Sequence, residues 1–76
     1  MRIPVQYPIT MDGVLDWFVA FQNTGHAVNE IRMPKKAYTR VQKVCRELIF
    51  DENYMFGATL VKDNNLSNEV EIVGFI

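Results

Sequence analysis

The sequence predicts a small α+β domain, with a four-stranded antiparallel or mixed sheet in β-α-β-α-β-β order and two helices packed on one face. Three observations predict this class. Apolar residues recur every three or four positions from Pro34 to about Phe50, as on a helix with one buried side. Near both ends of the chain they alternate with polar residues, as in a strand. Finally, 76 residues that are 49% hydrophobic suit one core, so residues 1–76 are expected to form a single domain.

The first expected element is a strand from Arg2 to Ile9, in which every second residue is apolar. Pro4 and Pro8 lie on its other face, four positions apart. Both missing N–H groups therefore point to the same lateral side, which cannot pair with a neighbour. We expect an edge strand that is protected against unwanted pairing.

The second element is a helix from Asp12 to Asn23. Thr10 and Asp12 suit its N-cap, and Gly25 suits its end. Its apolar side is broader than packing on one sheet requires. Trp17 and Phe21 lie toward one margin of that side, so we expect one of them to be partly exposed.

His26 to Met33 is expected to form a short strand, and Pro34 to start the main helix. A proline suits the first helical position and holds the preceding residue extended. The apolar stripe of this helix faces the core, so Cys45 is expected to be a small buried residue, since a reactive thiol needs an open, electropositive site. The stripe consists of Ala37, Tyr38, Val41, Val44, Cys45, Leu48 and Ile49.

The chain is expected to end in a β-hairpin. Residues 51–53 form a turn, Tyr54–Val61 a strand, the Asn-rich segment 62–68 a loop, and Glu69–Ile76 the return strand. Gly57 marks a bulge or a close approach of another backbone. Three aromatic side chains are assigned to the core, namely Phe18, Tyr38 and Phe56.

Composition argues against several function classes. The net charge of −1 argues against a strongly basic nucleic-acid binder, so nucleic acid is not an expected partner. The single cysteine permits no intramolecular disulfide, and no apolar run is long enough for a membrane span or a signal peptide. His26 is the only histidine, and no ligand spacing indicates a metal or a cofactor. We expect a cytoplasmic, membrane-independent protein that is not an enzyme.

Two groups of side chains are candidates for binding. The outward side of the main helix carries five cations, which could meet phosphates or an acidic partner, or could simply be solvated: Lys35, Lys36, Arg40, Lys43 and Arg46. The nine aromatic residues exceed what so small a core encloses. Four side chains are therefore expected to line a self-association or partner surface: Trp17, Phe21, Val73 and Phe75.

From Glu30 onward, the runs EIRMPKKAYTRVQ and YMFGATLVKDNNLSNEVEIVGF resemble those of short bacteriophage accessory proteins. Such proteins join a proline-started helix to a terminal segment with an Asn-rich turn. The resemblance implies a class that includes inhibitors of bacterial defence, such as anti-CRISPR proteins. It implies a non-enzymatic protein that binds and blocks a host protein in the bacterial cytoplasm. The same resemblance allows a homodimer or higher oligomer. Two alternatives remain open: an oligomeric sponge that sequesters a nucleotide signal, and a virion or assembly component.

Overall fold

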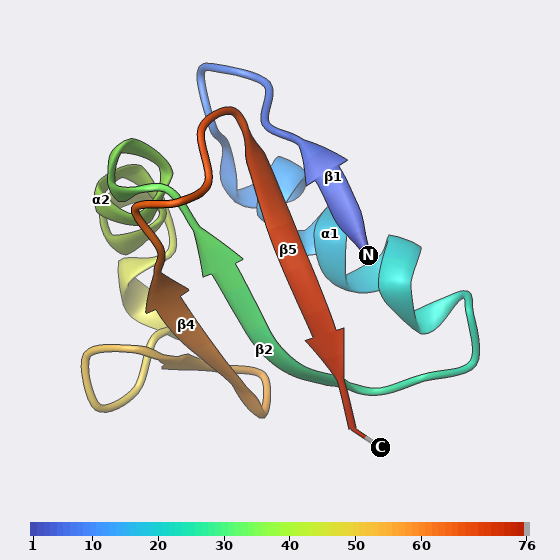
Figure 1. Cartoon of the computed structure of the whole chain (residues 1–76). Coiled ribbons are helices and arrows are strands. Elements are labelled where there is room, and N and C mark those ends of the chain that lie inside the picture. Colours follow the sequence, from blue (N-terminus) through green and yellow to red (C-terminus); the bar gives the residue numbers. More distant parts are fainter. Residues whose placement is uncertain (76) are drawn as a thin grey trace.

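The computed structural model describes residues 1–75 and shows the predicted α+β class (Figure 1). Its elements in chain order are β1 (Arg2–Pro4), α1 (Met11–Gln22), β2 (Val28–Met33), α2 (Lys35–Val44), the short 3-10 helix η1 (Arg46–Leu48), β3 (Tyr54–Met55), β4 (Ala58–Lys62) and β5 (Glu69–Gly74). The first four follow the predicted order, whereas three strands, and not two, follow the second helix.

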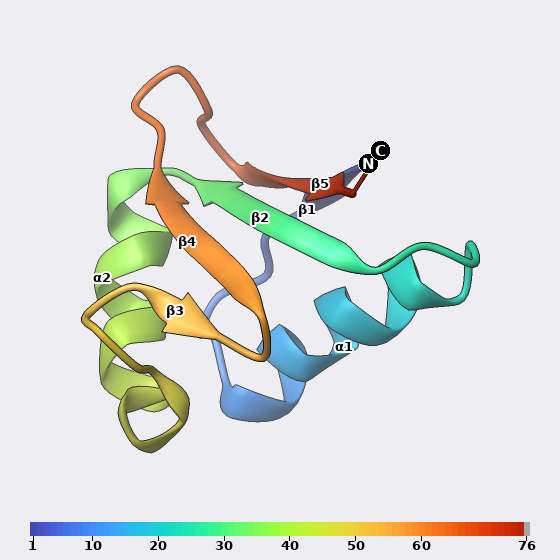
Figure 2. The ribbon, with the colours of Figure 1, turned by 90° about the horizontal axis from the view of Figure 1, so that it is seen from below.

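The strands form one mixed sheet in the order β1-β5-β2-β4-β3. The central strand β2 pairs parallel with β4 and antiparallel with β5. Both α-helices lie on the same face of this sheet (Figure 2). Ile31 of β2, Leu60 of β4 and Ile72 of β5 are adjacent in register and at most 2% exposed. These residues form the centre of the core, and within residues 1–75 no helix lies over the opposite sheet face.

The predicted hairpin between Tyr54–Val61 and Glu69–Ile76 is wrong. Its two strands belong to the same sheet, but β2 lies between them. The helix α2 carries the chain from β2 to the parallel strand β4, and the following loop crosses the end of β2 to reach β5 (Figure 1). The described part of β5 ends at Gly74, and Ile76 of the predicted strand lies outside the described residues.

The predicted strand Tyr54–Val61 is itself two strands. Phe56 and Gly57 have φ values of 52° and 80°, and these two positive angles form the tight turn that joins β3 to β4. Gly57 therefore serves a two-residue hairpin turn and not a bulge. Phe56, which was assigned to the core, is 57% exposed at this turn and contacts the edge of Phe18, with ring centroids 5.6 Å apart.

The edge position predicted for the first strand is confirmed, because among the described strands β1 pairs only with β5. Met1 and Ile72 exchange both backbone hydrogen bonds, and the N–H of Val5 donates to the carbonyl of Asn68. The backbone N–H and C=O groups of odd-numbered residues thus point toward β5. The missing N–H of Pro4 therefore lies on the free side, as its position predicts. The strand ends at Pro4 instead of Ile9, and Pro8 lies beyond it.

The helix ends follow local chemistry. The hydroxyl oxygen of Thr10 accepts the N–H of Gly13 at 3.1 Å and caps α1, as predicted. Pro34 caps α2 in an extended conformation and does not occupy its first helical position. The helix ends at Val44, earlier than predicted, because Cys45 leaves the helical region and η1 turns the chain toward β3. Cys45 is fully buried, which confirms its assignment to the core.

Candidate binding surface

The outward side of α2 carries a stripe of cations beside an open groove. Lys36, Arg40 and Lys43 are spaced by four and three residues, so they lie along one side of the helix. Together with Thr39 and the segment 7–9, they line a groove of about 490 Å³. The ammonium group of Lys36 lies 4.5 Å from the ring centroid of Tyr7. Part of the chain that precedes α1 thus forms the second wall of this groove.

A second groove, of about 580 Å³, continues along the same helix. Lys43 and Arg46 line it together with Lys62, the last residue of β4. The ammonium group of Lys62 lies 6.0 Å from the ring centroid of Tyr38. Thr39 and Lys43 line both grooves, so the two are continuous. We call the five cations that line them the basic surface: Lys36, Arg40, Lys43, Arg46 and Lys62.

The structure brings together four of the five cations predicted from the sequence. Lys35 is exposed but lines neither groove. Lys62 and Tyr7 were missed, because they come from segments distant in the sequence and only the fold places them beside α2. A cation at the end of a strand has no sequence pattern that links it to a helix.

Charge is segregated between this surface and the open face of the sheet. Within residues 1–75, the ion pairs closer than 4.0 Å all involve Arg2 or Arg32, and no carboxylate approaches the basic surface so closely. Inside this part of the chain, its five cations therefore have no ion-pair partner. An anionic partner would supply one and would be attracted to this surface.

The open sheet face, in contrast, is paired across its strands. Arg2 of β1 contacts Glu69 and Glu71 of β5 at 3.0 and 3.2 Å. Arg32 of β2 contacts Asp63 at 3.1 Å and Glu30 at 3.4 Å. Exposed pairs of this kind stabilise a fold little, but they leave few free charges. This face is therefore a weaker candidate for recognising a charged partner.

Acid should weaken the structure partly through Asp63. The backbone N–H of Asn65, and then the guanidinium of Arg32, hold the pKa of its carboxyl below the ordinary value of about 3.9. Since the folded pKa is the lower one, this stabilisation is present above that ordinary value and is lost as the pH falls through the folded pKa. We expect Asp63→Asn to be less stable than the parent at neutral pH, with a smaller loss upon acidification. Urea unfolding at a series of pH values measures this.

A matched control for that experiment is Glu47→Gln, which removes an exposed carboxylate with no ion pair among residues 1–75. It should follow the parent's pH profile. The assignment to Asp63 is contradicted if the two variants show the same profile.

The four predicted interface residues do not form one surface. Trp17 and Phe21 are only 7% and 8% exposed in the core beneath the sheet, so the prediction of an exposed aromatic surface there is wrong. β1 and the segment that follows it lie beside Trp17, and the end of β5 packs on Phe21. Val73 is half-buried on the opposite, open face, and Phe75 is 57% exposed beyond the end of β5. The exposed aromatic residues that the sequence did not reveal are Tyr7, Phe50, Tyr54 and Phe56.

The remaining candidates for chemistry have ordinary structural surroundings. Burial raises the pKa of the Cys45 thiol, which disfavours the reactive thiolate. The ring nitrogen Nδ1 of His26 lies 3.2 Å from the hydroxyl oxygen of Thr24, in the exposed loop before β2. In residues 1–75, no group of three or more histidine, cysteine, aspartate or glutamate side chains could hold a metal ion. Nor does that part of the chain contain a helix long and apolar enough to cross a membrane.

Comparison of the chain with protein-family models, with curated proteins and with solved structures gives no match.

Proposed function

We propose that this is a non-enzymatic binding protein that docks its basic surface onto an acidic surface of another protein. The observation that carries the proposal is the gathering of five cations, without ionic partners in residues 1–75, along two continuous grooves. Opposite charges across an interface speed association and select the partner.

The composition of the grooves favours a folded protein as the partner over a nucleic acid. Tyr7, Pro8 and Ile9 wall the first groove, and Tyr38 contributes to the second. Tyrosine and apolar side chains beside arginine are typical of the contacts that dominate protein interfaces. A long polyanion would also meet the net negative charge of the rest of the molecule.

The resemblance to phage accessory proteins extends this proposal to a biological role. A protein of that class would block a host protein in the infected bacterium, most directly a component of an antiviral defence system. Such inhibition needs no catalytic group, because a stoichiometric binder acts by occupying the surface that its target uses.

The Lys43→Glu variant should lose the partner. Lys43 lines both grooves, so the substitution places a negative charge where they meet. The exposed position should leave the free energy of unfolding within about 0.5 kcal/mol of the parent. We expect affinity capture from a bacterial lysate at low salt to retain a partner with the parent protein, and at least tenfold less of it with Lys43→Glu. Quantitative mass spectrometry of the eluates measures the difference.

Lys35→Glu is the matched control, since it makes the same charge change on the same helix outside both grooves. It should retain as much partner as the parent does. Equal retention by Lys43→Glu and Lys35→Glu, or no specific retention by the parent, would count against the proposed surface.

Nucleotide sequestration is the second candidate, and the first groove favours it specifically. Its volume of about 490 Å³ falls in the range of small-molecule sites. Three cations line it, and the partly exposed ring of Tyr7 lies beside them. Calorimetric titration with cyclic and ADP-ribose-type nucleotides tests this function. An absence of heat, with the protein folded, would eliminate it.

A further inference from the structure

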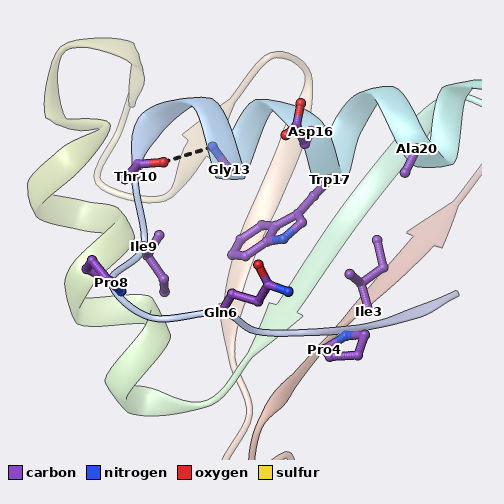
Figure 3. Close-up of a pocket in the computed structure, with 10 residues that line it drawn as sticks. All are labelled: Ile3, Pro4, Gln6, Pro8, Ile9, Thr10, Gly13, Asp16, Trp17 and Ala20. Atoms are coloured by element: carbon purple, nitrogen blue, oxygen red, sulfur yellow. Dashed lines mark hydrogen bonds between the residues drawn. The ribbon is translucent and has the colours of Figure 1, made fainter.

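A third groove lies between the segment that follows β1 and the helix α1. It encloses about 390 Å³, and apolar side chains form most of its walls (Figure 3). Ile3 contributes from β1 itself, Ile9 from the segment that follows it, and Ala20 from the helix. It adjoins the first groove of the basic surface through Pro8 and Ile9, which line both, yet none of the five cations lines it.

The indole N–H of Trp17 is the unusual polar group of this groove. The side chain is 93% buried, as its 7% exposure shows. Among the ten lining residues, Figure 3 draws a single hydrogen bond, between Thr10 and Gly13, so none of the other nine pairs with the indole. In residues 1–75, every fully buried side-chain nitrogen or oxygen has a partner, so an unpaired indole N–H keeps some exposure, and Trp17 lines this groove. The fold thus presents a fixed hydrogen-bond donor to whatever occupies the groove.

Two further side chains supply complementary groups. Gln6 points toward the indole from the opposite wall, and its amide can both donate and accept (Figure 3). Asp16 precedes Trp17 on α1 and contributes a carboxylate at the exposed rim. The groove therefore offers a donor, an acceptor and an amide within apolar walls. A carboxylate or phosphate ligand would be repelled by Asp16, whereas a neutral ligand with one acceptor and one donor would be matched.

A peptide unit has this chemistry, because its carbonyl accepts and its N–H donates. A nucleobase also carries both groups, but nucleobases are usually held by stacking on an exposed aromatic face. The ring of Trp17 is too deeply buried to offer one. The aliphatic and proline walls instead suit the apolar side chains of an extended chain. The observations therefore favour a peptide.

We propose that this groove binds an extended, uncharged peptide segment of a partner protein, with a backbone carbonyl accepting the indole N–H of Trp17. The neighbouring peptide N–H donates to Gln6 or Asp16. The site is separate from the basic surface and does not depend on the function proposed for it. The adjacency of the two sites would let one partner occupy both.

The experiment is a titration of the ¹⁵N-labelled full chain with N-acetyl-leucine-N′-methylamide, a blocked single residue with two peptide groups. Trp17 is the only tryptophan, so one indole cross-peak in the proton–nitrogen correlation spectrum reports on the groove. We expect this cross-peak to move to lower field and to saturate at millimolar probe, together with the side-chain amide peaks of Gln6. A cross-peak that does not move up to the solubility limit of the probe would overturn the proposal.

Two surface variants separate the groove from general effects. Gln6→Leu removes the amide and leaves every core residue unchanged. It should weaken probe binding at least fivefold. Gln22→Leu makes the same change at an exposed position of α1 outside the groove and should bind like the parent. Equal effects of the two variants would overturn the proposal. Lys43→Glu should leave the titration unchanged, so failure of the basic surface and failure of this groove can be told apart. Saturable binding of uridine, without binding of the blocked residue, would reassign the groove to a nucleobase.

Discussion

Ile31→Ala is expected to destabilise the fold by about 3–4 kcal/mol, in the range for truncating a fully buried isoleucine. Ile31 is 0% exposed and lies at the centre of the sheet, between Leu60 and Ile72 in register. A 76-residue domain has a stability of about 4–11 kcal/mol at typical values per residue, so this loss is a large fraction. Urea unfolding should show a lower midpoint with an unchanged m-value.

Val61→Ala serves as the comparison on the other face of the same sheet. Val61 is half-buried beside Arg32, with no helix above it, so we expect a loss of about 1 kcal/mol or less. Similar losses for the two variants would contradict the assignment of the core to the helix-covered face.

Gly74→Ala is expected to cost about 1–3 kcal/mol, because it overpacks a filled site. A Cβ atom at this position would lie 2.7 Å from Cζ and 2.9 Å from Cε1 of Phe21, and 3.3 Å from the carbonyl oxygen of Ala27. The ring of Phe21 thus packs directly on the backbone near the end of β5. Thermal and urea unfolding of the variant measure the loss.

A double-mutant cycle tests the cause of that loss. Phe21→Leu removes the ring atoms that the new methyl group would meet, so the double variant should be more stable than the sum of the single losses predicts. We expect a coupling of about 1 kcal/mol between the two positions. Strictly additive losses would show that the methyl group disturbs something other than Phe21.

The features that the sequence predicted correctly depend on near neighbours in the chain. The cap at Thr10 and the burial of Cys45 follow from helix geometry over a few residues. The free side of β1 follows from the parity of Pro4 alone. The basic side of α2 is of the same kind, because helical spacing determines which cations share a side.

The strand order could not be predicted in the same way, since it depends on pairing between distant segments. Glu69–Gly74 alternates as a return strand would, but the alternation does not say that β2 lies beside it. One local signal does point to part of the strand order. A strand, a helix and a strand in succession commonly form a parallel pair, which would have placed β4 next to β2.

The aromatic residues were misjudged because the sequence does not show what covers them. Trp17 and Phe21 appeared to exceed the needs of one helix–sheet contact. In the structure, Ile3 and Ile9 approach Trp17 from one side, and the end of β5 packs on Phe21. Phe56 was misjudged in the opposite sense, because its positive φ places it on a turn that only Gly57 indicated.

The two edges of the sheet determine whether copies of this protein can pair through their strands. At one edge, Pro4 removes one of the backbone donors on the free side of β1. At the other, β3 has only two residues, and the N–H of Leu60 is already taken by the carbonyl of Asn53. Neither edge offers a long template on which further copies could stack. Short or partly blocked edges thus limit fibre formation even where the protein is concentrated.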